Sequence, residues 1–151
     1  KGTPTDFSIG VAGYPEKHFE APNFPTDIEY LKQKIDAGAS YIVTQMFFDN
    51  AKYFSFVKAC REIGITIPII PGLKPVYNKK QLTVLPKIFH IDLPTALSNE
   101  MMKCKNDDDV AMLGTDWLYE QSKELKKAGV PVLHYYTLGK PGIVSEVVGR
   151  L

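Results

Sequence analysis

The sequence lacks the features of a membrane, metal-binding or nucleic-acid-binding protein. No hydrophobic run of its 151 residues approaches the ~20 that a membrane-spanning helix needs, and no secretory signal opens it. The two cysteines, Cys60 and Cys104, are isolated, and no CxxC, HExxH or Cys/His cluster is present. Two scattered cysteines are typical of free thiols in a reducing compartment. We therefore expect a cytoplasmic protein with no metal site and no membrane partner.

Neither sign of charge is in excess. Eighteen basic and 17 acidic residues give a formal net charge of +1, which argues against a nucleic-acid partner. The sequence also has no G-x-S-x-G, Walker or GxGxxG motif and no Ser-His-Asp order, so common hydrolase and nucleotide-binding sites are not indicated. With 44% hydrophobic and 23% charged residues, the chain has the composition of one globular domain, residues 1–151.

Short apolar runs alternate with amphipathic segments along the chain. This βα pattern, repeated four times, predicts parallel strands joined by helical crossovers. Four such units could form a small open sheet, or half of a (β/α)8 TIM barrel, which typically needs ~250 residues. The expected strands are residues 6–13, 41–47, 66–72 and 130–137, and the expected helices begin near residues 26, 50, 79, 94, 107 and 141.

Capping and breaking residues set the expected helix bounds. The first helix is predicted to start at a capping box, Thr26–Glu29, and to end at Gly38. Asn50 is predicted to cap the next helix, and Pro86 to break a later one. Pro68 and Pro71 each remove a ladder donor, so pairing of the third strand should be partial or bulged.

Polar residues follow the expected strands, at the edge where parallel α/β folds bind ligands. Gln45 interrupts an apolar run, and its amide either pairs with the amide of a ligand or is satisfied by neighbouring backbone. His18 could donate to a phosphate or hydroxyl, or face solvent in its loop. Tyr14 could stack on a ligand or plug the barrel rim. Lys140 could meet an anionic group at the rim, or be an ordinary loop lysine.

Five ordered blocks of the sequence resemble methylenetetrahydrofolate reductases, with the bacterial type closest in style. The resemblance covers nearly the whole chain and implies the C-terminal half of a flavin-containing TIM barrel, about its last four βα units. The blocks are Gly13–Ala21, Leu31–Ala39, Ile42–Asp49, Ile67–Pro75 and His134–Thr137.

The resemblance implies reduction of 5,10-methylenetetrahydrofolate to 5-methyltetrahydrofolate, with FAD as cofactor, NADH or NADPH as reductant, and a ping-pong mechanism. It assigns FAD contacts to Ala12, Tyr14, His18, Asp27 and Lys34, although spacing alone makes the last two a solvated helix face.

The same resemblance assigns folate contacts to Gln45, Gln81 and Lys140. Gln45 would also meet the nicotinamide. Lys140 stands where relatives commonly have Arg, and Leu85 stands where some have a stacking Phe.

The family's general acid and ring-side aspartate lie on strands that precede this stretch. We therefore expect no catalytic residue in this chain, a missing N-terminal half as its partner, and no turnover by the chain alone. A homo-oligomer is also expected. The alternative is a non-catalytic half-barrel that binds flavin or folate, with a second copy completing the barrel because exposed strand edges demand pairing.

Overall fold

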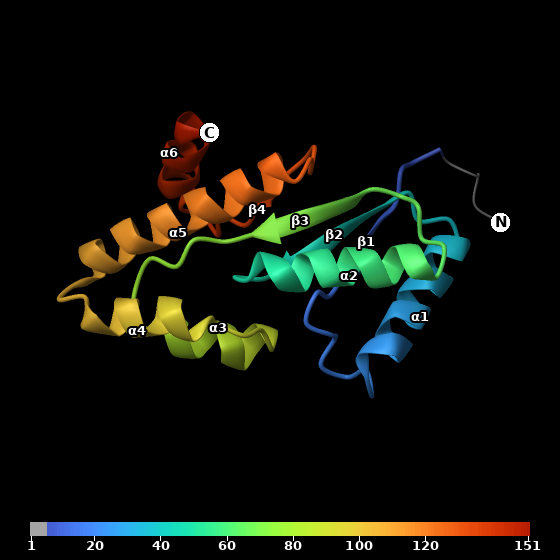
Figure 1. The fold of residues 1–151 in the computed structure, drawn as a ribbon, viewed down its shortest axis with the longest axis horizontal. Helices are drawn as coiled ribbons and strands as arrows, with labels where there is room; N and C mark the ends of the chain where they lie inside the picture. The colour runs from blue at the N-terminus through green and yellow to red at the C-terminus, as the bar shows by residue number, and fades with distance from the viewer. Residues whose placement is uncertain (1–5) are drawn as a thin grey trace.

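The computed structural model describes residues 6–151 as alternating strands and helices (Figure 1). None of the helices in this range is long and apolar enough to cross a membrane. The elements are β1 (Gly10–Gly13), α1 (Phe24–Asp36), β2 (Tyr41–Met46), α2 (Asn50–Glu62), β3 (Ile69–Leu73), α3 (Gln81–Phe89), α4 (Thr95–Lys103), α5 (Asp107–Lys127), β4 (His134–Tyr135) and α6 (Pro141–Arg150).

The strands form one parallel sheet in the order β1-β2-β3-β4, as the βα repeat predicts. Gly10 pairs with Tyr41, and the register of β2 on β3 shifts between Val43 and Met46. This irregularity lies opposite Pro71, which has no N–H to donate, and it confirms the expected bulge. The chain therefore has an α/β fold that corresponds to part of a TIM barrel.

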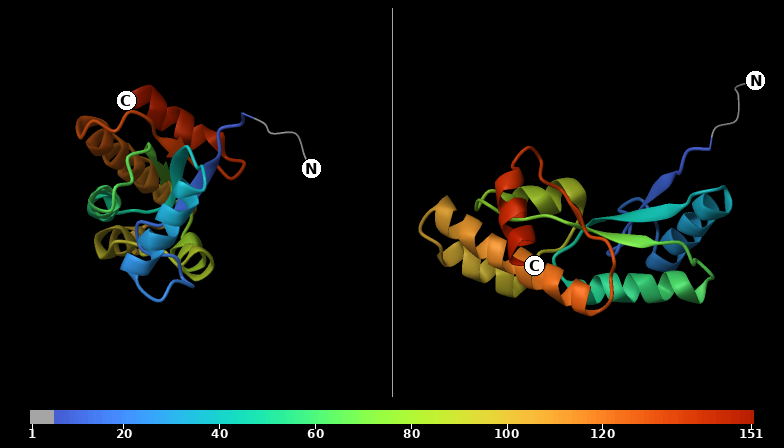
Figure 2. Two further views of the ribbon diagram at one scale, coloured as in Figure 1. Left: turned by 90° about the vertical axis from the view of Figure 1, so that its right-hand side faces the viewer. Right: turned by 90° about the horizontal axis from the view of Figure 1, so that it is seen from above.

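The two faces of the sheet differ. Helices α1, α2, α5 and α6 pack on one face, around a core that includes Ile42, Phe56 and Leu118 (Figures 1 and 2). On the other face Gly10 and Ala12 are exposed and Val43 is half-buried. In a closed barrel these inward positions would be filled by layers of side chains. The sheet of this chain thus has one covered face and one open face.

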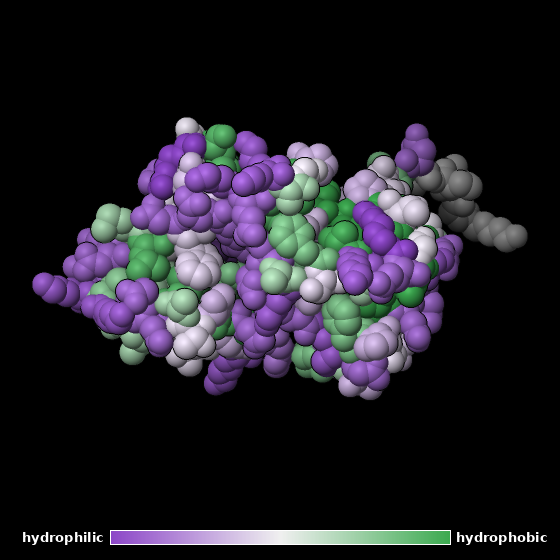
Figure 3. All heavy atoms as spheres, in the orientation of Figure 1, coloured by the Kyte–Doolittle hydropathy of each residue, from purple (hydrophilic) through white to green (hydrophobic). Residues whose placement is uncertain are grey.

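A second core lies beyond the carboxyl ends of the strands. It joins the end of β2 to α3, α4 and the start of α5 through Met46, Leu85, Leu97 and Val110, all buried. In the space-filling view, hydrophilic residues cover most of the surface over α5 and α6 (Figure 3). Through this second core, helices α3 and α4 pack beside the carboxyl edge of the sheet, where ligands bind in parallel α/β folds.

Two helix starts differ from the sequence prediction. Asn23, not Thr26, caps α1: its Oδ1 accepts from the Thr26 N–H at 2.9 Å, and Pro25 lies in the first turn. Asp49, not Asn50, caps α2 by accepting from the Ala51 N–H at 2.9 Å. Each predicted cap lies one residue or more too far along the chain, because another residue that can cap a helix, Asn23 or Asp49, precedes it.

Two other bounds were also wrong. Helix α3 continues through Pro86 and ends at Phe89, followed by the C-cap residue His90, whose φ of 53° and ψ of 45° are left-handed. Burial of Leu85 in the second core compensates for the one hydrogen bond that proline removes. Strand β4 is only His134–Tyr135, because it pairs with β3 alone among the described strands and Pro131 lacks a donor.

The cap assignment leads to a direct test. Replacing Asn23 with Ala removes the side-chain acceptor of α1, and we expect a loss of about 1 kcal/mol in the free energy of unfolding. Replacing Thr26 with Ala should change it by less than about 0.5 kcal/mol. Urea unfolding of both variants measures the difference. Equal losses would instead support the capping box.

Candidate active site at the carboxyl edge of the sheet

The loop after β1 brings together three of the residues predicted to contact FAD. The rings of Tyr14 and His18 meet edge to face at 4.5 Å, and the His18 backbone N–H donates to Oδ2 of Asp27 at 2.8 Å. Burial, and secondarily the negative charge of Asp27, raise the pKa of Tyr14. Asp27 thus fastens this loop to the first turn of α1.

Lys17 closes the same loop on itself. Its φ is 82°, and its Nζ donates to the carbonyl oxygens of His18 at 2.8 Å and Ala21 at 2.6 Å. The Nδ1 atom of His18 accepts from the Glu20 N–H at 3.3 Å, so in this hydrogen-bond arrangement the ring N–H lies on Nε2. The loop therefore holds an imidazole whose Nε2–H can donate to a phosphate or hydroxyl oxygen.

Glu16 ties the loop to the elements beside it. Its Oε2 accepts from the Asp92 backbone N–H at 2.8 Å, and the Lys52 ammonium lies between the Glu16 and Asp92 carboxylates, 2.9 and 2.5 Å away. Burial is the main cause that raises the pKa of Glu16, against the opposing pull of Lys52. The Tyr14–His18 loop is thereby held from both α1 and α2.

Gln45 lies at the end of β2, near Tyr14. Its Oε1 accepts from the Met46 N–H at 2.9 Å, so backbone next to it satisfies the amide oxygen. Gln45 and Tyr14 line one small cavity together with His90. Its volume of about 10 Å³ is that of a single water, so a ligand here would lie on the open face.

Gln81 and Lys140 gather around Tyr77, a residue that the sequence reasoning missed. The Oε1 of Gln81 accepts from the Tyr77 N–H at 2.9 Å. The Lys140 Nζ lies 4.5 Å from the centroid of the Tyr77 ring, and the Lys74 Nζ lies 4.8 Å from it. The two ammonium groups therefore make cation–π contacts with the same ring. Lys74 and Tyr77 follow β3 in the chain, and Lys140 directly precedes α6.

Lys74 is the other residue that was missed. It is 1% exposed, its Nζ donates to the Pro75 carbonyl at 3.0 Å, and burial lowers its pKa to about 8. The available signal was a lysine directly after an apolar strand, between Leu73 and Pro75. A buried cation at the ligand edge of a sheet marks a candidate functional position.

Ala12 and Lys34 lie apart from these groups. Ala12 is exposed on the open face of β1, next to Val43 of β2. Lys34 is exposed in the last turn of α1, seven residues and therefore about 10 Å along the helix from Asp27. An extended ligand could contact both Asp27 and Lys34, whereas a compact ligand could not.

The residues present fit a flavin dinucleotide in their chemistry. The half-buried His18 ring has a second nitrogen, Nε2, that can donate a hydrogen bond, and the small side chain of Ala12 leaves open space on the sheet. Within residues 6–151 no group of three His, Cys, Asp or Glu side chains could hold a metal ion. A hydrogen-bond donor beside open space is the kind of surface that can bind and orient an organic cofactor, and such a cofactor would supply the redox chemistry.

Comparisons with known proteins agree with the sequence blocks. The family model described as "Methylenetetrahydrofolate reductase" matches residues 2–151. A Caenorhabditis elegans protein, "Probable methylenetetrahydrofolate reductase (NADPH)", is 40% identical over 147 residues, covering 96% of this chain and 22% of its own length. A Pectobacterium carotovorum "5,10-methylenetetrahydrofolate reductase" is 38% identical over 136 residues, covering 89% of this chain and 46% of its own.

A solved structure shares the fold. It is titled "Uncharacterized protein from Clostridium thermocellum binds two copies of 5-methyl-5,6,7,8-tetrahydrofolic acid" and matches with a TM-score of 0.62 at 21% identity. The match covers 95% of this chain and 52% of that one. The chain thus spans about half or less of the proteins that it matches. On the family model and these identities, it belongs to the methylenetetrahydrofolate reductase family.

Proposed function

We propose that this chain is the C-terminal half of a barrel that reduces 5,10-methylenetetrahydrofolate to 5-methyltetrahydrofolate, supplying methyl groups for methionine synthesis. The observation that carries the proposal is family membership over residues 2–151, joined to a site at the carboxyl edge of the sheet. When bound, FAD would take a hydride from NADH or NADPH and pass it to the folate, in a ping-pong sequence. The reductase would work in the cytoplasm as a homo-oligomer.

The loop after β1 would hold the flavin. His18 would donate from Nε2, Tyr14 would pack against the cofactor, and Asp27 would keep the loop in place by accepting from the His18 backbone N–H. Ala12 would leave room on the open face, and Lys34 would reach a distal part of an extended FAD. These side chains bind and orient, and none of them moves a proton of the reaction.

The far side of the open face would hold the folate. Gln45 would turn its amide to the pterin in one half-reaction and to the nicotinamide in the other, exchanging its bond to the Met46 N–H for ligand contacts. Gln81 and Lys140, which both lie against Tyr77, would contact the rest of the folate. Lysine at 140 keeps the charge of an arginine without its bidentate fork.

The open face supports the proposal that the chain needs a second half. Inward positions such as Ala12 are exposed, whereas the inner layers of a barrel are filled. An N-terminal half would cover this face and bring the general acid, so the chain alone would not turn over substrate.

Co-expression with the N-terminal half of the Pectobacterium relative tests this. We expect a stable complex that retains FAD and oxidises NADH or NADPH when methylenetetrahydrofolate is present. Failure of the halves to associate would contradict the half-barrel assignment. A folded, FAD-loaded complex without activity would favour the alternative, a non-catalytic half-barrel that binds flavin or folate.

The same complex tests the role given to Asp27. Replacing Asp27 with Ala removes the acceptor of the His18 N–H, and we expect the dissociation constant of FAD to rise about tenfold, as for one lost charge-assisted hydrogen bond. Glu29, exposed on the same helix, gives the matched control: Glu29→Ala should leave FAD binding unchanged. Equal effects of both variants, measured by flavin titration, would contradict the role of Asp27.

A further inference from the structure

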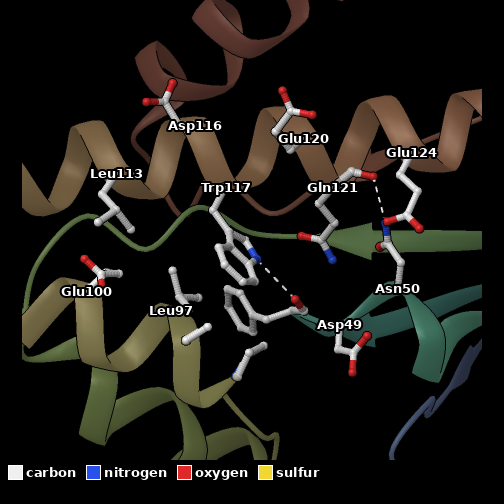
Figure 4. Close-up of a pocket in the computed structure, with 13 residues that line it drawn as sticks. Asp49, Asn50, Leu97, Glu100, Leu113, Asp116, Trp117, Glu120, Gln121 and Glu124 are labelled. Carbon is white, nitrogen blue, oxygen red and sulfur yellow. Dashed lines mark hydrogen bonds between the residues drawn. The ribbon is translucent and has the colours of Figure 1, made fainter.

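A second cavity, of about 770 Å³, lies among α2, α4 and α5, away from the site described above (Figure 4). Its volume is in the range of small-molecule sites. None of the residues assigned to FAD or folate lines it. The lining residues are Phe48, Asp49, Asn50, Pro94, Ala96, Leu97, Glu100, Leu113, Asp116, Trp117, Glu120, Gln121 and Glu124.

The floor of this cavity is apolar and fixed. The Trp117 indole N–H donates to the Phe48 carbonyl at 3.1 Å, which sets the plane of the ring. Leu97, 1% exposed, lies beside it on α4, and Leu113 lies one turn earlier on α5 (Figure 4). A held tryptophan with aliphatic neighbours suits an apolar body, and its ring face also attracts cations.

Every charged residue that lines the cavity is acidic. Three of these carboxylates have basic partners: Asp116 pairs with Arg150, Glu100 with Lys103, and Glu120 with Lys123. The other two, Asp49 and Glu124, take part in no ion pair formed within residues 6–151. Negative charge is therefore least compensated at the end of the cavity where α2 begins.

Two buried amide oxygens lie at that same end and lack donors. The Asn50 Nδ2 donates to the Gln121 carbonyl at 3.0 Å and to Glu124 Oε2 at 2.7 Å, and the Gln121 Nε2 donates to the Phe47 carbonyl at 3.0 Å. These bonds fix the orientation of both amides. Asn50 and Gln121 are each 6% exposed, and within residues 6–151 no hydrogen bond reaches their side-chain oxygens.

A buried acceptor without a donor costs about 1–3 kcal/mol, so two of them at one end of a cavity indicate a group that enters it. The carboxylates of Asp49 and Glu124 favour a cation. The amide oxygens of Asn50 and Gln121 favour a cation that carries N–H donors. The apolar floor around Trp117 selects a hydrocarbon or aromatic body.

We propose that this cavity binds a small organic cation: an ammonium or guanidinium group on an apolar body. The cationic group would sit between Asp49 and Glu124, within reach of the amides of Asn50 and Gln121, and the body would lie on Trp117. The proposal is independent of the folate and flavin assignments, because it uses none of their residues.

Trp117 provides a direct test because it is the one tryptophan of the sequence. The protein would be labelled with 15N at tryptophan and titrated with phenethylammonium, and Trp117→Phe would assign the indole signal. We expect a saturable shift of that signal with a dissociation constant below about 1 mM. The neutral isostere phenethyl alcohol should bind at least about tenfold more weakly, and the anion hydrocinnamate should not bind.

Paired variants locate the cationic group. Glu124→Gln and Asp49→Asn, the second of which keeps a capping oxygen for α2, should each weaken phenethylammonium binding about fivefold. Asp116→Asn should not, because Asp116 already pairs with Arg150 at 2.8 Å. The proposal is wrong if the indole signal does not saturate, if the alcohol binds as well as the ammonium, or if only a basic peptide binds.

Discussion

Replacing Gly114 with Ala is expected to lower the free energy of unfolding by about 3 kcal/mol and the melting temperature by roughly 10 °C. Gly114 lies in the middle of α5, where glycine is otherwise unfavourable. A Cβ atom at this position would overlap the Val76 carbonyl oxygen and lie 2.9 Å from the Val76 carbonyl carbon. Because the obstacle is backbone, no side-chain rotation can relieve the overlap.

The effect should extend to the site. Val76 precedes Tyr77, so an α5 helix pushed outward would shift the ring against which Lys74 and Lys140 lie. Gly142 gives the matched control, since it is also helical and a Cβ there meets nothing within 4 Å. Gly142→Ala should be neutral or stabilising by up to about 1 kcal/mol. Thermal unfolding of both variants measures the difference. Similar melting temperatures would contradict the close approach of α5 to the Val76 carbonyl at Gly114.

Much of the fold follows from patterns that act locally. Gly38, Gly64 and Gly129 follow helices α1, α2 and α5 with φ values of 115°, 81° and 84°, where a side chain would be strained. The βα alternation required parallel pairing, and the sheet has it. Bounds set by competition were harder to predict: Asn23 competes with Thr26 for the start of α1, and packing of Leu85 outweighs the break expected at Pro86.

For the candidate site, the sequence grouped only the residues that a motif links. Tyr14, His18 and Asp27 meet in space, and the sequence resemblance grouped them although the spacing of Asp27 alone suggested a solvated face. Tyr77 lies outside the five blocks, and Lys74 lies inside one of them without a role assigned to it. Their grouping depends on a contact of Tyr77 with Lys140, 63 residues further along the chain. Tertiary contacts of this kind cannot be read from periodicity.

Replacing Lys74 with Met is expected to raise the free energy of unfolding by about 2 kcal/mol at pH 7. The ammonium is buried, donates one hydrogen bond, and belongs to no ion pair formed within residues 6–151. Its pKa falls from 10.5 to about 8, so burial disfavours the charged form by up to about 3 kcal/mol. Methionine has a similar shape without the charge, and only the bond to Pro75 and the contact with Tyr77 are lost.

The pH dependence separates this cause from a gain in packing. Below about pH 8 Lys74 is charged in both the folded and the unfolded chain, so the full penalty of burial applies. Between about pH 8 and 10.5 the folded chain releases the proton first, the unfolded chain binds more protons, and the stability of the unmodified protein rises. The advantage of Lys74→Met should therefore shrink across that interval and be small above it.

Lys140→Met is the control, because Lys140 contacts the same Tyr77 ring but is exposed, and it should change stability by less than about 0.5 kcal/mol. Urea unfolding at several pH values measures both variants. A constant advantage of Lys74→Met from pH 7 to 10.5 would show that packing, not charge, is responsible. A shrinking advantage would identify Lys74 as a destabilising cation at the ligand edge of the sheet, which is the property expected of a residue retained for binding.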